Sequence, residues 1–162
     1  MIIMGIDPGT RTTGYGIINE QNGAISCVEY GAVKNSAKLS VWDCQLRIFD
    51  GISKIIGEYN IDAVAVESQF FSKNPDSAMK IGAARSVALL PATRAGLTIN
   101  EYAPKRIKKA VVGTGTATKS QMQLMIQKML GLTEKIEPED AADALGIAIC
   151  HLHNHKFMER IK

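Results

Sequence analysis

The chain opens with Met1-Ile2-Ile3-Met4-Gly5-Ile6-Asp7-Pro8-Gly9, an apolar run that ends in an acid and a turn. A short, continuous apolar run bounded by turn residues predicts a buried strand. Pro8-Gly9 predicts the turn, because proline sets φ for its second position and glycine accepts positive φ. The strand therefore delivers Asp7 to a place where a soluble chain has little structural reason to put a charge.

Three more acids share this setting. Glu67 ends the apolar run 63–66, and Asp140 and Asp143 open the apolar run that continues to Cys150. Buried carboxylates are rare unless they are paired or bind a metal. Two unit charges ~4 Å apart repel by roughly 4 kcal/mol at an effective dielectric of 20, so such a cluster needs a cation. Carboxylates that hold Mg²⁺ are the apparatus for cutting or transferring phosphodiesters.

Each acid alone also has a structural explanation. Asp140 could favour the dipole of a first helical turn, and Asp7 could cap the Pro-Gly turn. Asp143 lies a turn deeper, where the dipole argument fades. Glu67 has the poorest structural explanation, because Glu disfavours strands and has no turn to cap here. One shared metal site explains all four positions better than four separate accidents do.

The composition is typical of a folded protein with one domain. The chain has 162 residues, of which 46% are apolar and 22% charged, and its net charge of +3 says little about a partner. Cys27, Cys44 and Cys150 match no metal or redox spacing, which is typical of small buried side chains in a reducing cytosol. No signal peptide or membrane span is predicted, so we expect a cytoplasmic protein.

The pattern along the chain predicts a meander and then alternating helices and strands. Asn22-Gly23 is a hairpin signal between two of the expected strands. The order β-β-β-α-β-α-β-α-α-α predicts an α/β fold, a five-stranded mixed sheet with helices on both faces. The expected strands are 1–7, 13–20, 26–34, 62–67 and 98–102, and the expected helices are 39–59, 74–96, 104–112, 118–130 and one from 138.

Three local features carry further expectations. Pro91 should kink the second long helix or end it early. Gly14 and Gly16 point to one face of their strand, for a twist or bulge or to leave room for a metal-bound phosphate. The first long helix should turn one apolar stripe to the core, and that stripe is Leu39, Trp42, Leu46, Phe49, Ile52 and Ile56.

The predicted topology would gather the acids. If strands 1–7 and 62–67 are parallel neighbours, Asp7 and Glu67 both lie at the carboxyl edge, where open α/β sheets bind ligands. Asp140 and Asp143 are three residues apart, so they share one face of the last helix.

Basic residues follow in a cluster. Such a run is more often a solvated face, but the adjoining Gly/Thr loop at 113–116 offers backbone donors that suit phosphate contact. These residues are Lys105, Arg106, Lys108, Lys109 and, after the loop, Lys119.

The segment after Glu67 carries Phe70-Phe71 and Lys73. Two adjacent aromatics cannot both face a core from one strand end, so one is expected to be exposed. It would then either anchor the loop or stack on bases. At the other end of the chain, the histidines at 151, 153 and 155 are expected to form a polar helix end, since no third metal ligand is evident.

These residues resemble four motifs of the RuvC family of Holliday-junction resolvases. The first is Gly5–Arg11 with Thr13–Gly16, and the second is Glu67 with Phe70 and Lys73-Asn74. The third is Val111–Gly113 with Lys119–Gln121, and the fourth is Asp140–Leu145. The resemblance implies an RNase H-like fold, and we expect a single nuclease domain over residues 1–156 with a tail at 157–162. It also implies a homodimer that binds a four-way DNA junction, and it suggests a branch-migration helicase as a further partner.

The same resemblance implies the site residues. Its four acids fall on Asp7, Glu67, Asp140 and Asp143, which would hold two Mg²⁺ ions per site, with Mn²⁺ as a substitute. Its basic active-site positions fall on Lys108 and Lys119, and its aromatic at the strand crossover falls on Phe70. Lys73, Lys105, Arg106 and Lys109 are then candidate DNA contacts. The activity implied is Mg²⁺-dependent resolution of junctions by paired symmetric nicks, in recombination and repair.

Other functions remain to be separated from this one. A related nuclease could act on other branched DNA or on RNA, and a basic patch alone could bind junctions without cutting them. Actin-like ATPases and sugar kinases have a similar opening motif around Asp7, Gly9 and Thr10, but they need two lobes, and 162 residues are too few for both.

Overall fold

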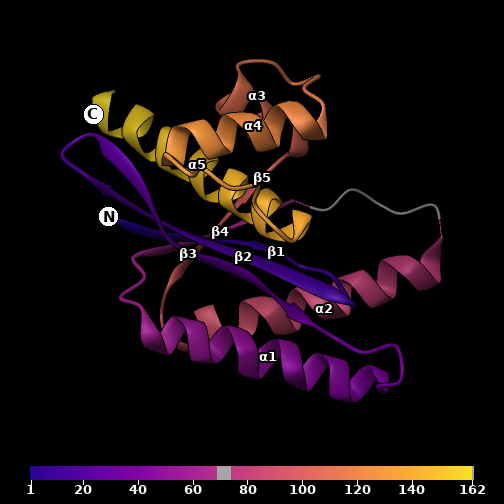
Figure 1. Ribbon diagram of the computed structural model, residues 1–162. Coiled ribbons are helices and arrows are strands. Elements are labelled where there is room, and N and C mark those ends of the chain that lie inside the picture. The colour runs from indigo at the N-terminus through magenta and orange to yellow at the C-terminus, as the bar shows by residue number, and fades with distance from the viewer. Residues whose placement is uncertain (69–73, 162) are drawn as a thin grey trace.

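The fold agrees with the predicted order of elements. The computed structural model describes residues 1–68 and 74–161 (Figure 1). The strands are β1 (Ile2–Asp7), β2 (Thr12–Gln21), β3 (Ala24–Lys34), β4 (Ala63–Glu67) and β5 (Thr98–Tyr102). The helices are α1 (Val41–Glu58), α2 (Pro75–Arg94), α3 (Pro104–Val112), α4 (Lys119–Leu130) and α5 (Glu139–Arg160).

The strands form one mixed sheet in the order β3-β2-β1-β4-β5. β1 pairs antiparallel with β2 and parallel with β4, so the expectation of parallel neighbours is confirmed. Asn22 and Gly23 have φ values of 53° and 88° at the β2–β3 turn. Positive φ at both positions is what a type I′ hairpin turn requires, and it explains the Asn-Gly pair.

Helices cover both faces of the sheet (Figure 1). α1 and α2 lie on one face, and α3, α4 and α5 lie on the other. Neighbouring residues of one strand pack into two separate cores on opposite faces of the sheet, because side chains alternate along a strand. Met4 packs toward the α1–α2 side, whereas Ile3 packs toward the α5 side.

Glycines let α5 lie directly against the central strands. A Cβ on Gly5 would stand 1.9 Å from the carbonyl oxygen of Ala144, and a Cβ on Gly14 would stand 2.1 Å from that of Asp140. A Cβ on Gly16 would stand 2.5 Å from Cγ of Leu145. The room expected for a phosphate beside Gly14 and Gly16 is therefore filled by the main chain and side chains of α5.

The expected core stripe of α1 is wrong in part. Trp42 is 77% exposed and Leu46 is 58% exposed, while Ile52 is buried as expected. α1 carries two apolar stripes, and periodicity alone does not say which one faces the sheet. The compact, mainly isoleucine stripe takes the core position, and its buried members are Cys44, Ile48, Ile52 and Ile55.

Pro91 does not end α2 early. The helix continues to Arg94, and the N–H of Ala95 donates to the Pro91 carbonyl at 3.0 Å. A proline removes one donor and crowds the carbonyl four residues before it, so it disturbs the preceding turn and leaves the following residues free to stay helical. The Pro91 ring is buried.

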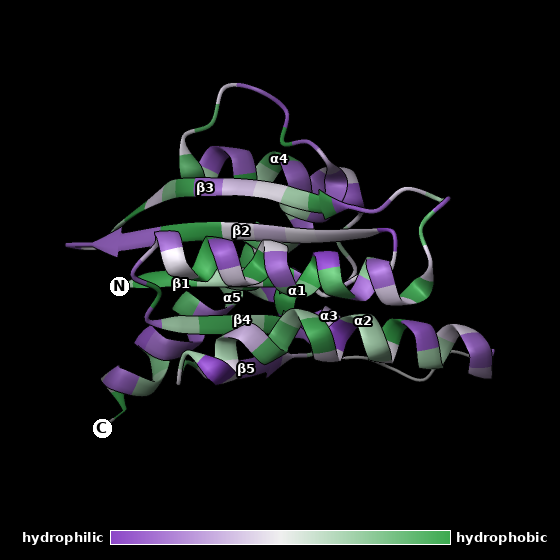
Figure 2. Ribbon diagram, turned by 90° about the horizontal axis from the view of Figure 1, so that it is seen from below, coloured by the Kyte–Doolittle hydropathy of each residue, from purple (hydrophilic) through white to green (hydrophobic). Residues whose placement is uncertain are grey.

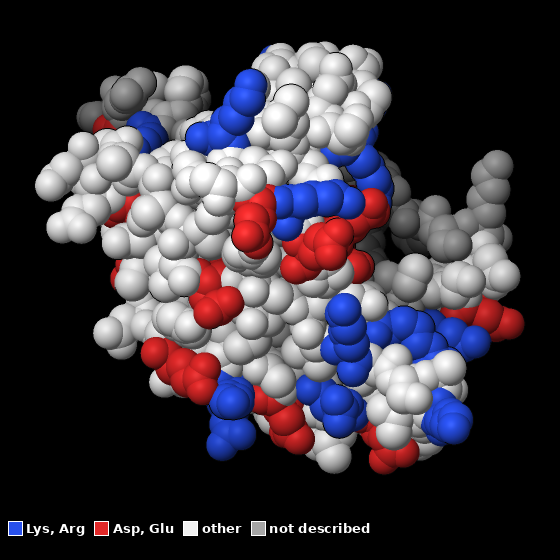
Figure 3. Space-filling view, viewed as in Figure 1, with Lys and Arg blue, Asp and Glu red and all other residues white. Residues whose placement is uncertain are grey.

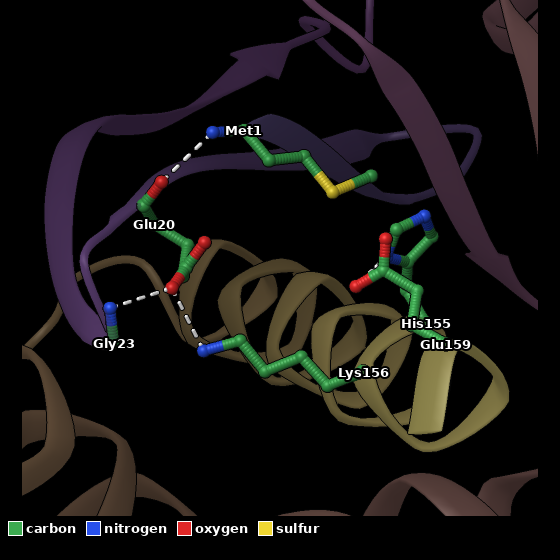
Figure 4. Close-up of polar contacts among 6 residues, drawn as sticks. All are labelled: Met1, Glu20, Gly23, His155, Lys156 and Glu159. Atoms are coloured by element: carbon green, nitrogen blue, oxygen red, sulfur yellow. Dashed lines mark hydrogen bonds and ion pairs between the residues drawn. The ribbon is translucent and has the colours of Figure 1, made fainter. Parts of the chain in front are cut away.

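The C-terminal half of α5 is tied to the β2–β3 hairpin (Figure 4). Lys156 Nζ lies 2.9 Å from Glu20 Oε1, which also accepts from the N–H of Gly23 at 2.9 Å. The terminal amine of Met1 donates to the Glu20 carbonyl at 2.8 Å. α5 extends to Arg160, and the domain boundary expected at residue 156 stays a prediction.

His151 is not part of a polar helix end. It is buried, and its Nδ1 lies 2.8 Å from the hydroxyl of Tyr102 at the end of β5. Burial lowers the pKa of His151, with a smaller contribution from His155, and so favours the neutral ring. None of the helices formed by the described residues combines the length and the apolar character that a membrane crossing needs.

Candidate active site

Two acids meet at the carboxyl edge of the sheet. β1 and β4 run parallel with Ile6 opposite Val66, so the next residues, Asp7 and Glu67, end neighbouring strands side by side. β1 can extend no further as a paired strand, because Pro8 has no N–H to donate. The turn that follows is closed by the Thr13 hydroxyl, which donates to the Gly9 carbonyl at 2.8 Å.

The first turns of α5 bring the other two acids to this edge. Gly14 is the partner of Asp7 in the β1–β2 pairing, and it is the residue against which the Asp140 main chain packs. Asp143 lies one turn further along the same face of α5. The absent side chain at Gly14 is thus the reason that α5 can hold its acids next to Asp7.

The electrostatics show that the four carboxylates act on one another. Burial raises the pKa of Asp7 to about 7, with further contributions from the negative charges of Asp143, Asp140 and Glu67. Burial and Asp143 likewise raise the pKa of Glu67. Burial raises the pKa of Asp143, although the ammonium of Lys119 opposes that rise. Such crowding of buried negative charge is relieved by a bound cation.

Three of the acids and two lysines line one cavity of about 310 Å³. Asp7, Glu67 and Asp143 contribute from the sheet edge and α5, while Lys108 comes from α3 and Lys119 from the first residue of α4. Asp140 is not among the lining residues, so it belongs to the cluster by charge and by its contact with Gly14.

Lys119 takes the place of a counter-ion in this arrangement. Its Nζ lies 3.6 Å from Asp143 Oδ2 and 3.8 Å from Glu139 Oε2. The charge of Asp143 is the main cause that raises the pKa of Lys119. A capping box between Thr118 and Gln121 starts α4 and so fixes where this lysine leaves the main chain.

The donor set fits a hard divalent cation. Carboxylate oxygens are the ligands that Mg²⁺ and Mn²⁺ prefer, and the four acids provide them on one edge. Within residues 1–68 and 74–159, however, no three acidic, histidine or cysteine side chains stand close enough to form a metal shell as they are. An ion would have to draw the carboxylates together and displace the Lys119 ammonium from Asp143.

The basic side chains of α3 point to different surroundings. Lys108 lines the acidic cavity, whereas Lys105 and Lys109 are exposed to solvent. Arg106 is held on the α5 side, where it bonds to Asn154 Oδ1 and lies 5.6 Å from the ring centroid of Tyr102. The candidate contacts Phe70 and Lys73 lie outside the described residues.

A second cavity of about 440 Å³ adjoins the first between α4 and the start of α5. Lys119, Met122 and Asp143 line both cavities, so they form the wall between them. Lys135 and Glu139 add one charge of each sign to the second cavity. Figure 3 shows acidic and basic side chains side by side on this face of the molecule. Sequence reasoning did not anticipate this second hollow.

Sequence reasoning also missed Arg85 on α2. Its Nη1 donates to the main-chain carbonyl of Glu67 at 2.7 Å, and its Nη2 lies 2.8 Å from Glu101 Oε1. Its side chain is only 14% exposed. A signal was present in the sequence, because Arg85 stands alone among the small residues Gly82, Ala83, Ala84 and Ser86.

Comparison with known proteins decides the family. Residues 3–151 match the family model described as crossover junction endodeoxyribonuclease RuvC. The chain belongs to the RuvC family. Among curated relatives of that name, the protein of Citrifermentans bemidjiense is 47% identical over 95% of this chain and 93% of its own length. The protein of Syntrophomonas wolfei is 44% identical over 96% of this chain and 91% of its own length.

Solved structures support the same assignment. Thermus thermophilus RuvC in complex with a Holliday junction substrate is 32% identical to this chain, with a TM-score of 0.91 over 97% of this chain and 96% of the other. The fold is therefore that of a RuvC-family protein, the RNase H-like fold expected from the sequence. The fowlpox virus Holliday junction resolvase has a TM-score of 0.60 at 15% identity, which shows a shared fold alone.

Proposed function

We propose that this RuvC-family enzyme is a Mg²⁺-dependent endonuclease that resolves four-way DNA junctions by paired, symmetric nicks. The observation that carries the proposal is the cluster of Asp7, Glu67, Asp140 and Asp143, in which burial, together with the charges of the other three acids, raises the pKa of Asp7 to about 7. Family membership and the junction-bound relative support the substrate. Mn²⁺ is expected to substitute for Mg²⁺, since both take carboxylate oxygens.

In this mechanism the four acids would hold two divalent ions. When bound, these ions would supply an activated water and would stabilise charge on the leaving oxygen. Water oxygen forms the new bond to phosphorus, the bond to the 3′ oxygen breaks, and that oxygen takes up a proton. Lys119, released from Asp143, offsets charge on the phosphorane, while Lys108 holds a neighbouring phosphate in the same cavity.

Paired nicks require two active sites, and a two-fold dimer supplies them to a two-fold junction. The outward face of α2 offers a contact for a second copy. Met79 is 75% exposed and Leu90 is 53% exposed, and they lie three turns apart on one side of the helix. Between them lie Gly82 and Ser86, and a Cβ on Gly82 would meet nothing within 4 Å. Exposed apolar residues around small ones suit close helix packing.

The neighbouring helix extends this surface. Trp42 and Leu46, the residues of α1 that the sequence led us to expect in the core, are exposed one turn apart. Figure 2 shows α1 and α2 lying across the same face of the sheet, with hydrophobic segments on both helices. A homodimer built on this face would bury side chains that are costly to leave in water. A branch-migration helicase as partner and action in the cytoplasm stay predictions.

The decisive experiment compares substrates and products. A synthetic four-way junction, a linear duplex of the same sequence and a branched RNA are each incubated with enzyme and Mg²⁺, and the cuts are mapped on every strand. We expect symmetric nicks in the junction alone. Asp7→Asn should bind the junction but not nick it, while Asp50→Asn on α1 is the control. Equal cutting of duplex, or full activity of Asp7→Asn, would refute the proposal.

A further inference from the structure

The main-chain carbonyl of Glu67 has no main-chain N–H of β1 to accept from. Successive residues of a strand direct their main-chain groups alternately to the two neighbouring strands. Because the N–H of Ser68 donates to the Tyr102 carbonyl of β5 at 2.8 Å, the carbonyl of Glu67 is directed toward β1. With Ile6 opposite Val66, the group that should donate to it is the N–H of residue 8, and residue 8 is proline.

Arg85 supplies the missing donor from another layer of the fold. Its Nη1 donates to the Glu67 carbonyl at 2.7 Å, while Nη2 is held by Glu101 Oε1 at 2.8 Å. Glu101 lies opposite Val66, so the guanidinium reaches the sheet edge from the α1–α2 face. A carbonyl without a donor is costly to shield from water, and a charged donor such as a guanidinium makes a strong hydrogen bond to it.

We propose that Arg85 is a positioning residue that fixes the end of β4 and thereby aims the Glu67 carboxylate at the metal site. The two ends of its planar fork bind two different acceptors, which the single ammonium of a lysine cannot reproduce. Neighbours that orient a metal ligand typically change metal affinity about 10- to 100-fold when they are removed. This inference rests on the proposed function, because it takes Glu67 to be a metal ligand.

The same contact connects the site to the proposed dimer face. Arg85 is adjacent in sequence to Ser86, which lies on the outward face of α2 together with Gly82. α2 therefore carries the dimer contact on one side and the support of Glu67 on another. A subunit whose α2 is displaced loses its hold on Glu67, so the metal site depends on the helix that recruits the second copy.

The test measures Ca²⁺ binding to the DNA-free protein by calorimetry, with thermal unfolding in EDTA as a check of the fold. Arg85→Met and Arg85→Lys should each weaken Ca²⁺ binding about 10- to 100-fold. Glu101→Gln keeps an acceptor for Arg85 and should weaken it less. Arg94→Lys, near the exposed end of the same helix, should leave it unchanged. Wild-type affinity in Arg85→Met would overturn the inference.

A rescue experiment separates positioning from general damage. Pro8→Ala restores an N–H where the Glu67 carbonyl is directed, so it should recover part of the Ca²⁺ affinity lost in Arg85→Met. If Pro8→Ala and Arg85→Met weaken binding additively, the missing-donor argument is wrong. Failure of the wild-type protein to bind Ca²⁺, Mg²⁺ or Mn²⁺ at all would instead refute the proposed metal site.

Discussion

The two faces of the sheet are covered in opposite ways. On one face, α5 lies so close to β1 and β2 that Gly5 and Gly14 have no room for a Cβ. On the other face, α1 and α2 bury one side each and leave large apolar residues such as Trp42 and Leu90 in solvent. The first face uses close packing to hold charges together, and the second keeps a surface available for another molecule.

This difference shows how one small chain can separate chemistry from assembly. On the α5 face, close packing holds Asp140 and Asp143 beside Asp7, so the geometry of this face is rigid. The α1–α2 face supports the same edge through the half-buried side chain of Arg85. Substitutions on either face of the sheet test this difference.

The largest effect should come from adding a methyl group beneath α5. Gly14→Ala would place a Cβ 2.1 Å from the Asp140 carbonyl oxygen, so α5 must move or the protein must unfold. We expect a loss of about 4 kcal/mol or more in the free energy of unfolding, measured by urea denaturation. The matched control is Gly57→Ala in α1, where no atom lies within 4 Å and a neutral or slightly stabilising change is expected.

The next effect concerns the opposite face. Leu90→Glu puts a charge in the proposed contact between α2 helices and should weaken dimerisation at least about 100-fold, or about 3 kcal/mol. Sedimentation equilibrium measures the dissociation constant. Leu124→Glu, a similar change on an exposed leucine of α4, should leave the dimer intact. A dimer that survives Leu90→Glu and dissociates with Leu124→Glu would place the interface on the α4 side of the sheet and contradict the proposed α2 contact.

The charge cluster predicts a pH-dependent effect of Asp7→Asn in the metal-free protein. The pKa of Asp7 is about 7 in the folded state against an ordinary 3.8, so folding binds a proton. The free energy of unfolding therefore falls as pH rises from about 4 to about 7, and the cost is complete above that. Asp7→Asn removes this cost and should stabilise the protein by about 2 kcal/mol more at pH 8 than at pH 5.

Denaturation in EDTA at both pH values measures that difference, with Asp50→Asn as the control. A stabilisation that is the same at pH 5 and pH 8 would mean that burial and the neighbouring acids do not raise the pKa of Asp7.

The smallest effect tests the far end of the α5 face. Tyr102→Phe removes the hydroxyl that pairs with the buried Nδ1 of His151. A cost of about 1 kcal/mol in the free energy of unfolding is expected, since a buried acceptor or donor is left unpaired. Tyr30→Phe leaves this pair intact and is the control. No loss of stability in Tyr102→Phe would show that water replaces the hydroxyl.

The strand ends and the order of elements followed from local pattern. An apolar run that ends in an acid marked both β1 and β4, so the meeting of Asp7 and Glu67 could be predicted once the strands were taken as parallel. What pattern could not decide was direction. On α1, Ile52 is buried while Trp42 is exposed. On α3, Lys108 lines the acidic cavity while Arg106 bonds to Asn154. In both helices the tertiary packing decides which side chain faces which neighbour.

Arg85 shows why part of the site stays hidden in a sequence. Its role depends on the register of β4 against β1, on the missing N–H of Pro8 and on the direction of one carbonyl. None of these is a property of the residues around Arg85. The glycines of β2 were noticed, but their purpose required knowing that α5 crosses them.

The central claim is that the four acids jointly hold divalent ions. Crystals soaked in Mn²⁺ test it directly, because anomalous scattering locates the ion without any assay of activity. We expect Mn²⁺ bound by Asp7 and Glu67 together with Asp140 or Asp143, and Lys119 moved away from Asp143. Saturating Mn²⁺ that leaves Lys119 paired with Asp143 and no ion among these carboxylates would contradict the account.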